Sequence, residues 1–417
     1  MKICVVGLGY VGLPLYIELS KEFEEVLGFD ISEKRVKQLR KKIDSTNEVN
    51  ENELASTSVL FTSNPKDLSD YNFFIVCVPT PINELKDPDL GPLIKASETV
   101  GEFMPKNSIV VFESTVFPGA TEDFCVPVLE SKSGFIHKKD FNVGYSPERI
   151  NPGDKERTIR KIKKIVSGDT DDSLKVISKI YSKIIDAGIV KAKSIKAAEA
   201  AKVLENTQRD INIGLMNEFS NICNSLELNT KEVLDLASTK WNFLNFFPGL
   251  VGGHCIGVDP YYLSYIAKKE GIDPKMILSA RETNDNVPSQ IIKQIKLKLE
   301  EKEITYNQIK ICFFGVTFKE NVPDTRNSLA LNLAYKLKEE GFDLMICDPN
   351  VKDDIPEIKI NSFSEVENEK FDILIIAVPH KQIISKDKDW FLGLLKEKSL
   401  LVDIYGAIEG LKSDFSL

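Results

Sequence analysis

The sequence predicts an α/β protein with two doubly wound parallel sheets joined by a long central helix. Short apolar segments alternate with helical segments before residue 194, and the same alternation restarts near residue 303. Between them lies a stretch of helical periodicity that contains little glycine or proline. The 417 residues also exceed what one hydrophobic core usually organises. We therefore expect three domains, at 1–193, 194–300 and 301–417.

In the first domain, each apolar run of strand length is followed by a helical segment. We expect strands at 3–6, 26–29, 73–78, 109–113 and 142–145, and helices at about 11–21, 90–104 and 121–131. The lysine-rich stretch 155–164 is most simply interpreted as a solvated surface.

The central domain opens with a helix expected from 194 to about 228, which is unusually long for one globular domain. Such a helix would connect two domains and offer a packing surface to a second subunit. Shorter helices and a glycine-rich loop at 249–257 follow. The third domain then returns to strands at 309–314, 344–347, 371–378 and 400–402, with helices at 328–340 and 389–395.

Charge and composition argue against several classes of function. The net charge of −9 does not favour binding to nucleic acid or to a membrane surface. The seven cysteines show no paired spacing, which argues against a disulfide framework and for a reducing compartment. We see no signal peptide, no apolar stretch that would span a bilayer and no metal-ligand pattern. The expected location is the cytoplasm.

The turn after the first strand carries the motif Gly7-Leu8-Gly9-Tyr10-Val11-Gly12. By itself this pattern is weak, but here it follows a strand, opens a helix and precedes an acidic residue at the end of the next strand, Asp30. In a Rossmann-like domain such glycines allow a tight turn and close approach of a pyrophosphate, and the acidic residue binds the ribose hydroxyls. Asp30 favours NAD, although Arg35 nearby leaves some room for NADP.

The sequence Val251-Gly252-Gly253-His254-Cys255-Ile256-Gly257-Val258-Asp259-Pro260 is the most unusual local feature. Cys255 could be a buried cysteine in a turn, or a nucleophile near the carboxylate of Asp259. His254 is a poor base for Cys255, because adjacent side chains usually diverge. A thiolate beside a dinucleotide site suggests oxidation of an alcohol to an aldehyde, capture as a thiohemiacetal, a second oxidation to a thioester and hydrolysis to an acid, with two NAD consumed.

Motifs spread over all three segments resemble the UDP-glucose/GDP-mannose dehydrogenase family. They are Gly7-Leu8-Gly9-Tyr10-Val11-Gly12-Leu13-Pro14, Val78-Pro79-Thr80-Pro81, Glu113-Ser114-Thr115-Val116, Tyr145-Ser146-Pro147-Glu148-Arg149, the pair Lys202 and Asn206, the cysteine loop, and Phe318-Lys319 with Asp324-Thr325-Arg326. The stretches at 239–244 and 248–263 look like the branch that oxidises UDP-GlcNAc or UDP-GalNAc to uronates for surface polysaccharides such as capsule or O-antigen.

The resemblance implies roles for individual residues. The catalytic set would be Cys255 as nucleophile, Lys202 and Asn206 over the reacting carbon, Asp259 and Glu148 in the hydrolysis, and Thr115 beside the attacking water. The NAD site would comprise Gly7, Gly9, Tyr10, Val11, Gly12, Asp30, Arg35, Thr80, Thr115 and Arg326. Substrate contacts would come from Glu148, Arg149, Lys202, Asn206, Gly249, Gly252 and Lys319. We expect a homodimer that packs on the long helix, and higher assemblies stay open from the sequence.

Three positions depart from the UDP-glucose members of the family. Pro152 stands where they have a second glutamate, Thr239 falls near their intersubunit arginine, and no arginine matches their substrate contact near Gly406. His254 stands where they usually have serine, so it is not expected to be essential. All three departures concern the substrate, and they fit a different sugar better than a different reaction. Arg149 could compensate.

Several alternatives stay open from the sequence. The substrate could be UDP-glucose or UDP-ManNAc rather than UDP-GlcNAc or UDP-GalNAc. The chain could instead be a two-electron dehydrogenase of the hydroxyacid type with a structural Cys255, or a non-catalytic sensor of sugar nucleotides. Intact glycine-loop, lysine and cysteine positions argue against the sensor.

Overall fold

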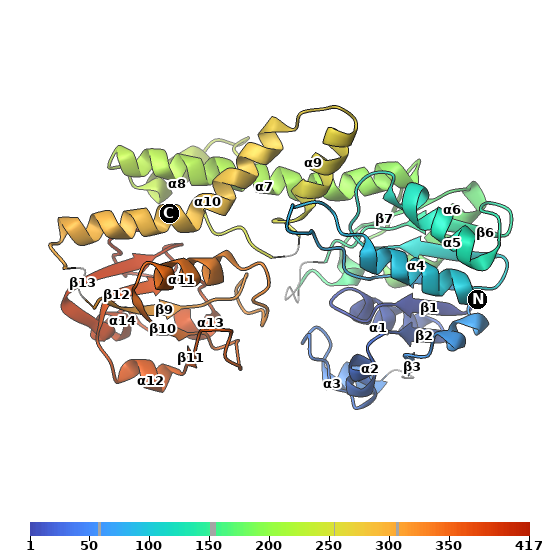
Figure 1. Ribbon diagram of the computed structural model, residues 1–417, viewed down its shortest axis with the longest axis horizontal. Helices are drawn as coiled ribbons and strands as arrows, with labels where there is room; N and C mark the ends of the chain where they lie inside the picture. The colour runs from blue at the N-terminus through green and yellow to red at the C-terminus, as the bar shows by residue number, and fades with distance from the viewer. Residues whose placement is uncertain (57–59, 151–155, 254, 306–307) are drawn as a thin grey trace. The chain divides into compact units, whose positions relative to one another are not determined.

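The computed structural model describes residues 1–56, 60–150, 156–253, 255–305 and 308–417. The chain forms two compact units (Figure 1). The first comprises Met1–Asn206 with Tyr261–Asp273, and the second comprises Thr207–Pro260 with Pro274–Leu417. Two helices run from one unit into the other: α7 (Ile195–Ser225) and α9 (Asp259–Lys269).

The first unit is built on an eight-stranded sheet in the order β3-β2-β1-β4-β5-β6-β7-β8. Its strands are β1 (Ile3–Val6), β2 (Val26–Phe29), β3 (Phe61–Thr62), β4 (Phe73–Val76), β5 (Ser108–Phe112), β6 (Phe141–Tyr145), β7 (Lys164–Gly168) and β8 (Ile189–Lys191). All neighbouring pairs are parallel except β6 with β7. The order of the first six strands is that of a dinucleotide-binding Rossmann domain, as expected.

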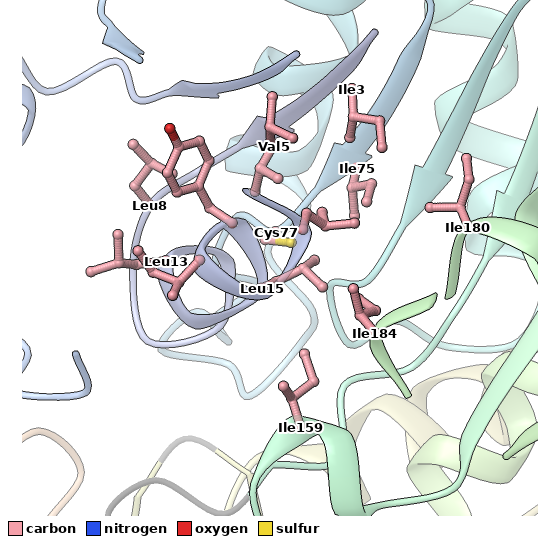
Figure 2. Close-up of a cluster of buried hydrophobic side chains, with 14 of the residues drawn as sticks. Ile3, Val5, Leu8, Leu13, Leu15, Ile75, Cys77, Ile159, Ile180 and Ile184 are labelled. Atoms are coloured by element: carbon pink, nitrogen blue, oxygen red, sulfur yellow. The ribbon is translucent and has the colours of Figure 1, made fainter. Parts of the chain in front are cut away.

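Helices cover this sheet on both faces. They are α1 (Gly12–Glu22), α2 (Glu33–Arg40), α3 (Glu51–Ser56), η1 (Pro65–Asp70), α4 (Gly91–Phe103), the π-helical turn η2 (Thr121–Cys125), α5 (Val126–Ser133), η3 (Ile159–Lys161) and α6 (Asp171–Ile184). α1 and α6 share one apolar cluster with alternate residues of β1 and β4, such as Val5 and Ile75 (Figure 2). Because side chains alternate along a strand, the intervening residues face the opposite side, which explains why these strands are buried throughout.

The second unit repeats this topology in a five-stranded sheet ordered β11-β10-β9-β12-β13, with every pair parallel. Its elements are α8 (Thr230–Ser238), α10 (Lys275–Glu301), β9 (Lys310–Phe314), α11 (Leu329–Glu339), β10 (Asp343–Cys347), β11 (Ile360–Asn361), α12 (Phe363–Glu367), β12 (Phe371–Ile376), α13 (Lys381–Ile384), α14 (Lys388–Leu394) and β13 (Leu395–Asp403). α10 and α11 pack on one face of the sheet, and α12 to α14 pack on the other. The two Rossmann-like sheets predicted from the sequence are confirmed.

Candidate functional site

The glycine loop lies between β1 and α1, at the carboxyl edge of the first sheet. Gly7 has φ +92° and its N–H donates to the Phe29 carbonyl at 2.8 Å, so the chain turns sharply there. A Cβ on Gly12 would lie 1.8 Å from the Gly7 oxygen, whereas a Cβ on Gly9 would meet no atom within 4 Å. The loop is thus closed on its inner side and open at Gly9, beside the N–H groups that begin α1. This arrangement fits a pyrophosphate.

Asp30, directly after β2, and Arg35, on α2, hold the glycine loop in place. Asp30 Oδ2 accepts the Leu8 N–H at 2.9 Å, and Arg35 Nε donates to the Leu8 carbonyl at 2.8 Å. Arg35 is largely buried and also pairs with Asp44 at 2.8 Å. Both residues therefore lie beside the loop, as the sequence predicted. Arg35 also stabilises the conformation of the loop through its bond to Leu8.

Thr80 and Thr115 follow β4 and β5 at the same edge of the sheet. The Thr80 hydroxyl donates to the Thr115 carbonyl at 2.7 Å, and the Tyr262 hydroxyl donates to the Thr80 carbonyl at 2.7 Å. Tyr262 is fully buried and comes from α9, so it ties this helix to the loop. Nothing local in the sequence marks Tyr262, because its partner is a carbonyl 182 residues away along the chain.

Lys202 and Asn206 lie one turn apart on α7, with Lys202 buried to 7% exposure. The same helix face carries Glu199, whose carboxylate accepts the N–H groups of Gly119 (2.6 Å) and Thr121 (2.9 Å). These bonds fasten the segment after Thr115 to the turn of α7 just before Lys202. At 7% exposure, Lys202 is not solvated as an ordinary lysine on a helix surface would be.

Glu148 lies three residues after the end of β6 and belongs to a buried ionic cluster. Its Oε1 accepts the N–H groups of Arg149 (2.6 Å) and Ile150 (2.5 Å), and its Oε2 lies 3.2 Å from Lys164 Nζ. Burial opposes ionisation, but Lys164 and the two N–H groups outweigh it and lower the pKa of Glu148. Lys164 also pairs with Glu113 at 2.7 Å.

The solvated-surface interpretation of residues 155–164 was wrong for Lys164. Lys161 and Lys163 are exposed, but Lys164, the first residue of β7, is only 3% exposed, because its side chain lies against two buried carboxylates.

Arg149 directs its guanidinium to this chain's own groups. It pairs with Glu205 of α7 at 2.7 Å and donates to the Lys163 carbonyl at 2.9 Å. The ion pair with Glu205 thus fastens the segment that carries Glu148 to α7. Whether Arg149 also binds substrate stays a prediction.

In the second unit, Cys255 is exposed, whereas the other six cysteines are buried. Burial raises the pKa of the thiols of Cys125 and Cys347 to about 12, so these two stay protonated and unreactive. The N–H of Asp259, at the start of α9, donates to the Cys255 carbonyl at 2.8 Å, and Asp259 is only 1% exposed. His254 and Pro152 lie outside the described residues.

The cysteine loop rests directly on the loop after β9. Gly253 has φ +86°, and a Cβ there would lie 2.6 Å from the Phe318 ring; its N–H donates to the Asn327 carbonyl at 3.1 Å. A Cβ on Gly252 would also lie 2.6 Å from that carbonyl. The glycines therefore allow two backbones to meet, which places Cys255 and Lys319 on adjoining loops.

The loop after β9 has its own support from the sheet edge. Asp348 Oδ2 accepts the Val316 N–H at 2.7 Å and lies 3.1 Å from Nε2 of the fully buried His380. His380 Nδ1 accepts the Asn321 N–H at 2.9 Å, two residues beyond Lys319. The exposed Arg326 pairs with Asp324 at 2.7 Å. Asp348 directly follows β10, just as Asp30 directly follows β2. In both units, a carboxylate at this position accepts an N–H from the loop after the first strand of the sheet.

The other end of the cysteine loop is held by α7 and the C-terminal segment. Asn217 accepts the Gly249 N–H at 2.8 Å and donates to the Gly249 carbonyl at 3.1 Å. A Cβ on Gly249 would lie 2.6 Å from the Tyr405 ring, and the Tyr405 hydroxyl accepts the Leu250 N–H at 3.1 Å. Both ends of the loop are therefore fixed by hydrogen bonds within the second unit.

The expected site residues thus form two groups. The first unit gathers the glycine loop, Asp30, Arg35, Thr80, Thr115, Glu148, Arg149, Lys202 and Asn206; the second gathers Gly249, Gly252, Cys255, Asp259, Lys319 and Arg326. Among the described residues, no three His, Cys, Asp or Glu side chains are placed to hold a metal ion. Within the same residues, no helix is both long and apolar enough to cross a bilayer.

Comparisons with known proteins indicate the same family in all three parts of the chain. Three models of the UDP-glucose/GDP-mannose dehydrogenase family match: the NAD binding domain at residues 1–185, the central domain at 196–286 and the UDP binding domain at 312–410. Protein CapL of Staphylococcus aureus is 48% identical over 98% of this chain and 96% of its own length. UDP-N-acetyl-D-glucosamine 6-dehydrogenase of Pseudomonas aeruginosa is 46% identical over 100% and 99%. The structure of UDP-D-ManNAc dehydrogenase from Pyrococcus horikoshii superimposes with a TM-score of 0.90 at 30% identity, covering 100% and 98%.

Proposed function

The chain belongs to the UDP-glucose/GDP-mannose dehydrogenase family and is a NAD-dependent nucleotide-sugar dehydrogenase, and on this premise we propose that it oxidises the primary alcohol of a UDP-N-acetylhexosamine to the uronic acid. The observation that supports a four-electron reaction best is Cys255. It is exposed while six other thiols are buried, and it lies on a loop fixed at both ends. A two-electron dehydrogenase has no use for such a thiol.

NAD binds at the glycine loop, where Gly9 leaves room for the pyrophosphate and Asp30 binds the adenosine ribose. Tyr10, Val11 and Gly12 supply the start of α1, and Thr80 and Thr115 line the adjoining edge. Arg35 and Arg326 complete the cofactor contacts. When bound, NAD accepts a hydride in each of the two oxidation steps.

Cys255 and Lys202 then act on C6 of the sugar. The Cys255 thiolate adds to the aldehyde carbon, forming a C–S bond, and Lys202 with Asn206 stabilises the oxygen that gains charge. After the second oxidation a thioester remains. Water adds to that carbon, the C–S bond breaks, and the products are the carboxylic acid and the Cys255 thiol.

Glu148 and Asp259 serve the hydrolysis step. Glu148 is held ionised by its neighbours, so it accepts a hydrogen bond from the attacking water and directs the oxygen to the thioester. Thr115 holds the same water, and Asp259 assists Lys202 in orienting it. Gly249, Gly252, Arg149 and Lys319 contact the UDP-sugar.

We propose UDP-GlcNAc or UDP-GalNAc as the substrate, in the synthesis of a capsule or O-antigen. Two relatives named UDP-N-acetyl-D-glucosamine 6-dehydrogenase are each 46% identical over the whole chain, and CapL is similarly close. UDP-ManNAc is the second candidate, because relatives at 34% identity carry that name. The seven cysteines form no disulfide, which suits a reducing compartment, so we place the reaction in the cytoplasm.

We further propose a homodimer formed through the helical part of the second unit. Large apolar side chains are exposed on α7, at Leu215 (56%) and Ile222 (47%), and directly after the helix at Leu226 (62%). The spacing of seven residues places Leu215 and Ile222 on one helix face. Trp241, exposed to 92%, lies in the segment after α8. An apolar face of this kind is typical of a protein–protein interface.

The test is NADH production over a panel of UDP-sugars, with the wild-type protein and Cys255→Ala. We expect two NADH per UDP-N-acetylhexosamine from the wild type and a loss of turnover in the variant. One NADH per substrate with near-normal turnover in Cys255→Ala would favour a two-electron dehydrogenase. NAD binding without NADH formation from any UDP-sugar would favour a sensor.

A further inference from the structure

Lys164 occupies a position that the proposed reaction does not yet use. It is the first residue of β7, and its ammonium lies 2.7 Å from Glu113 Oε2 and 3.2 Å from Glu148 Oε2. The side chains of Lys164 and Glu113 are 3% and 0% exposed. One buried cation therefore joins the carboxylate of the hydrolytic step to a second carboxylate.

The surroundings of this cation come from four elements of the first unit. Tyr181 of α6 donates its hydroxyl to Glu113 Oε1, and its ring lies 5.5 Å from Lys164 Nζ. The buried thiol of Cys77, after β4, is a further titratable group facing the cluster. Glu113 follows β5, and Glu148 follows β6. Groups on separate elements therefore contact the ammonium.

The pKa values of the two carboxyl groups in the cluster shift in opposite directions. Burial raises the pKa of Glu113 to about 7, whereas the pKa of Glu148 is lowered. Burial opposes the charge on Lys164, but the two carboxylates outweigh it and raise its pKa. Near neutral pH, Lys164 and Glu148 are therefore charged, and a proton taken up by the cluster goes to Glu113.

We propose that Lys164 is a positioning residue for thioester hydrolysis, which fixes the orientation and the charge of Glu148 and is itself held by Glu113 and Tyr181. The inference rests on the proposed role of Glu148. Oε1 of that residue is already held by two backbone N–H groups, so Lys164 determines where Oε2 lies. Without Lys164, Glu148 would lose its counter-ion in a buried site and take up a proton more readily.

The experiment compares Lys164→Met with its exposed neighbour, Lys163→Met, and with Glu148→Gln. NADH formation is followed after rapid mixing with NAD and a UDP-sugar that the wild type oxidises, and the mass of the intact protein is measured during turnover. For Lys164→Met we expect a burst of up to two NADH per site followed by a steady rate about ten- to a hundredfold below that of Lys163→Met. The thioester on Cys255 should accumulate, as in Glu148→Gln. A purely structural role would lower both phases together.

Tyr181→Phe guards against misfolding of Lys164→Met, because it removes only the hydroxyl that bonds to Glu113. It should show the same burst with a smaller drop in the steady rate. If Glu148→Gln shows the burst but folded Lys164→Met and Tyr181→Phe do not, the inference is wrong and the proposed function stands. If the wild type forms no NADH with any UDP-sugar, the proposed function fails and takes the inference with it.

Discussion

Gly253→Ala should damage the cysteine loop far more than Gly257→Ala, although the two glycines flank Cys255 two residues away on either side. Gly253 has φ +86°, a conformation that costs a residue with a Cβ about 1–2 kcal/mol. The new methyl group would also lie 2.6 Å from the Phe318 ring, whereas carbon atoms usually approach to about 3.5–4.0 Å. The ring or the loop must therefore move by about 1 Å.

The expected effect follows from that displacement. A 1 Å misplacement of a reacting group costs about 10²-fold in rate, so kcat of Gly253→Ala should fall by about two orders of magnitude. At Gly257 the nearest atoms to a new Cβ are at 3.6 Å, an ordinary contact, and φ is not in the left-handed region. Gly257→Ala should keep kcat within a fewfold of wild type.

The assay is the initial rate of NADH formation at saturating NAD and UDP-sugar, with circular dichroism to show that both variants fold. The rate at which iodoacetamide alkylates Cys255 reports the loop directly, because the other six thiols are buried. Equal losses of kcat in the two variants would refute the reasoning. So would a normal rate for Gly253→Ala.

Two further predictions concern the two sheet edges. Gly12→Ala would place a Cβ 1.8 Å from the Gly7 oxygen, so NAD binding measured by calorimetry should be lost; an unchanged Kd would contradict this geometry. At the second edge, burial opposes ionisation of Asp348, but its bonds, led by that to His380, lower its pKa below 3.8. Around that pH the folded state binds fewer protons than the unfolded state. Ionised Asp348 therefore stabilises the fold above about pH 4, and this stabilisation is lost as the pH falls below that value. In urea denaturation, Asp348→Asn should lose most stability near neutral pH, and a difference from wild type that does not change with pH would contradict the linkage.

Both sheets and most of their strands could be predicted because buried parallel strands are continuous apolar runs. The strands at Ile3–Val6 and Val26–Phe29 were placed without error, and α7 within three residues. The 27-residue helix α10 was not predicted. It contains Pro288, which removes a helical hydrogen bond and interrupts the sequence pattern, yet Pro288 is buried and the helix continues. Packing on the second sheet overrides that local signal.

The candidate site could be predicted where residues are recognised by a local motif. Gly7 to Gly12 and the cysteine loop are examples, because turns and close backbone contacts demand glycine at fixed spacing. Residues that hold these motifs in place carry no such mark. Glu199 and Tyr262 bond to backbone groups 80 and 182 residues away, and only the folded chain brings the partners together.

Lys164 shows why residues that hold a motif in place cannot be predicted from the sequence. It belongs to a lysine-rich run whose described members Lys161 and Lys163 are exposed, and its partners lie 51 and 16 residues away. At the start of β7 its side chain lies among buried groups rather than in solvent. A lysine buried without carboxylates would lose its charge, and two buried carboxylates without a cation would not both stay ionised. The three groups therefore require one another, and it is this mutual requirement that keeps Glu148 anionic inside the protein.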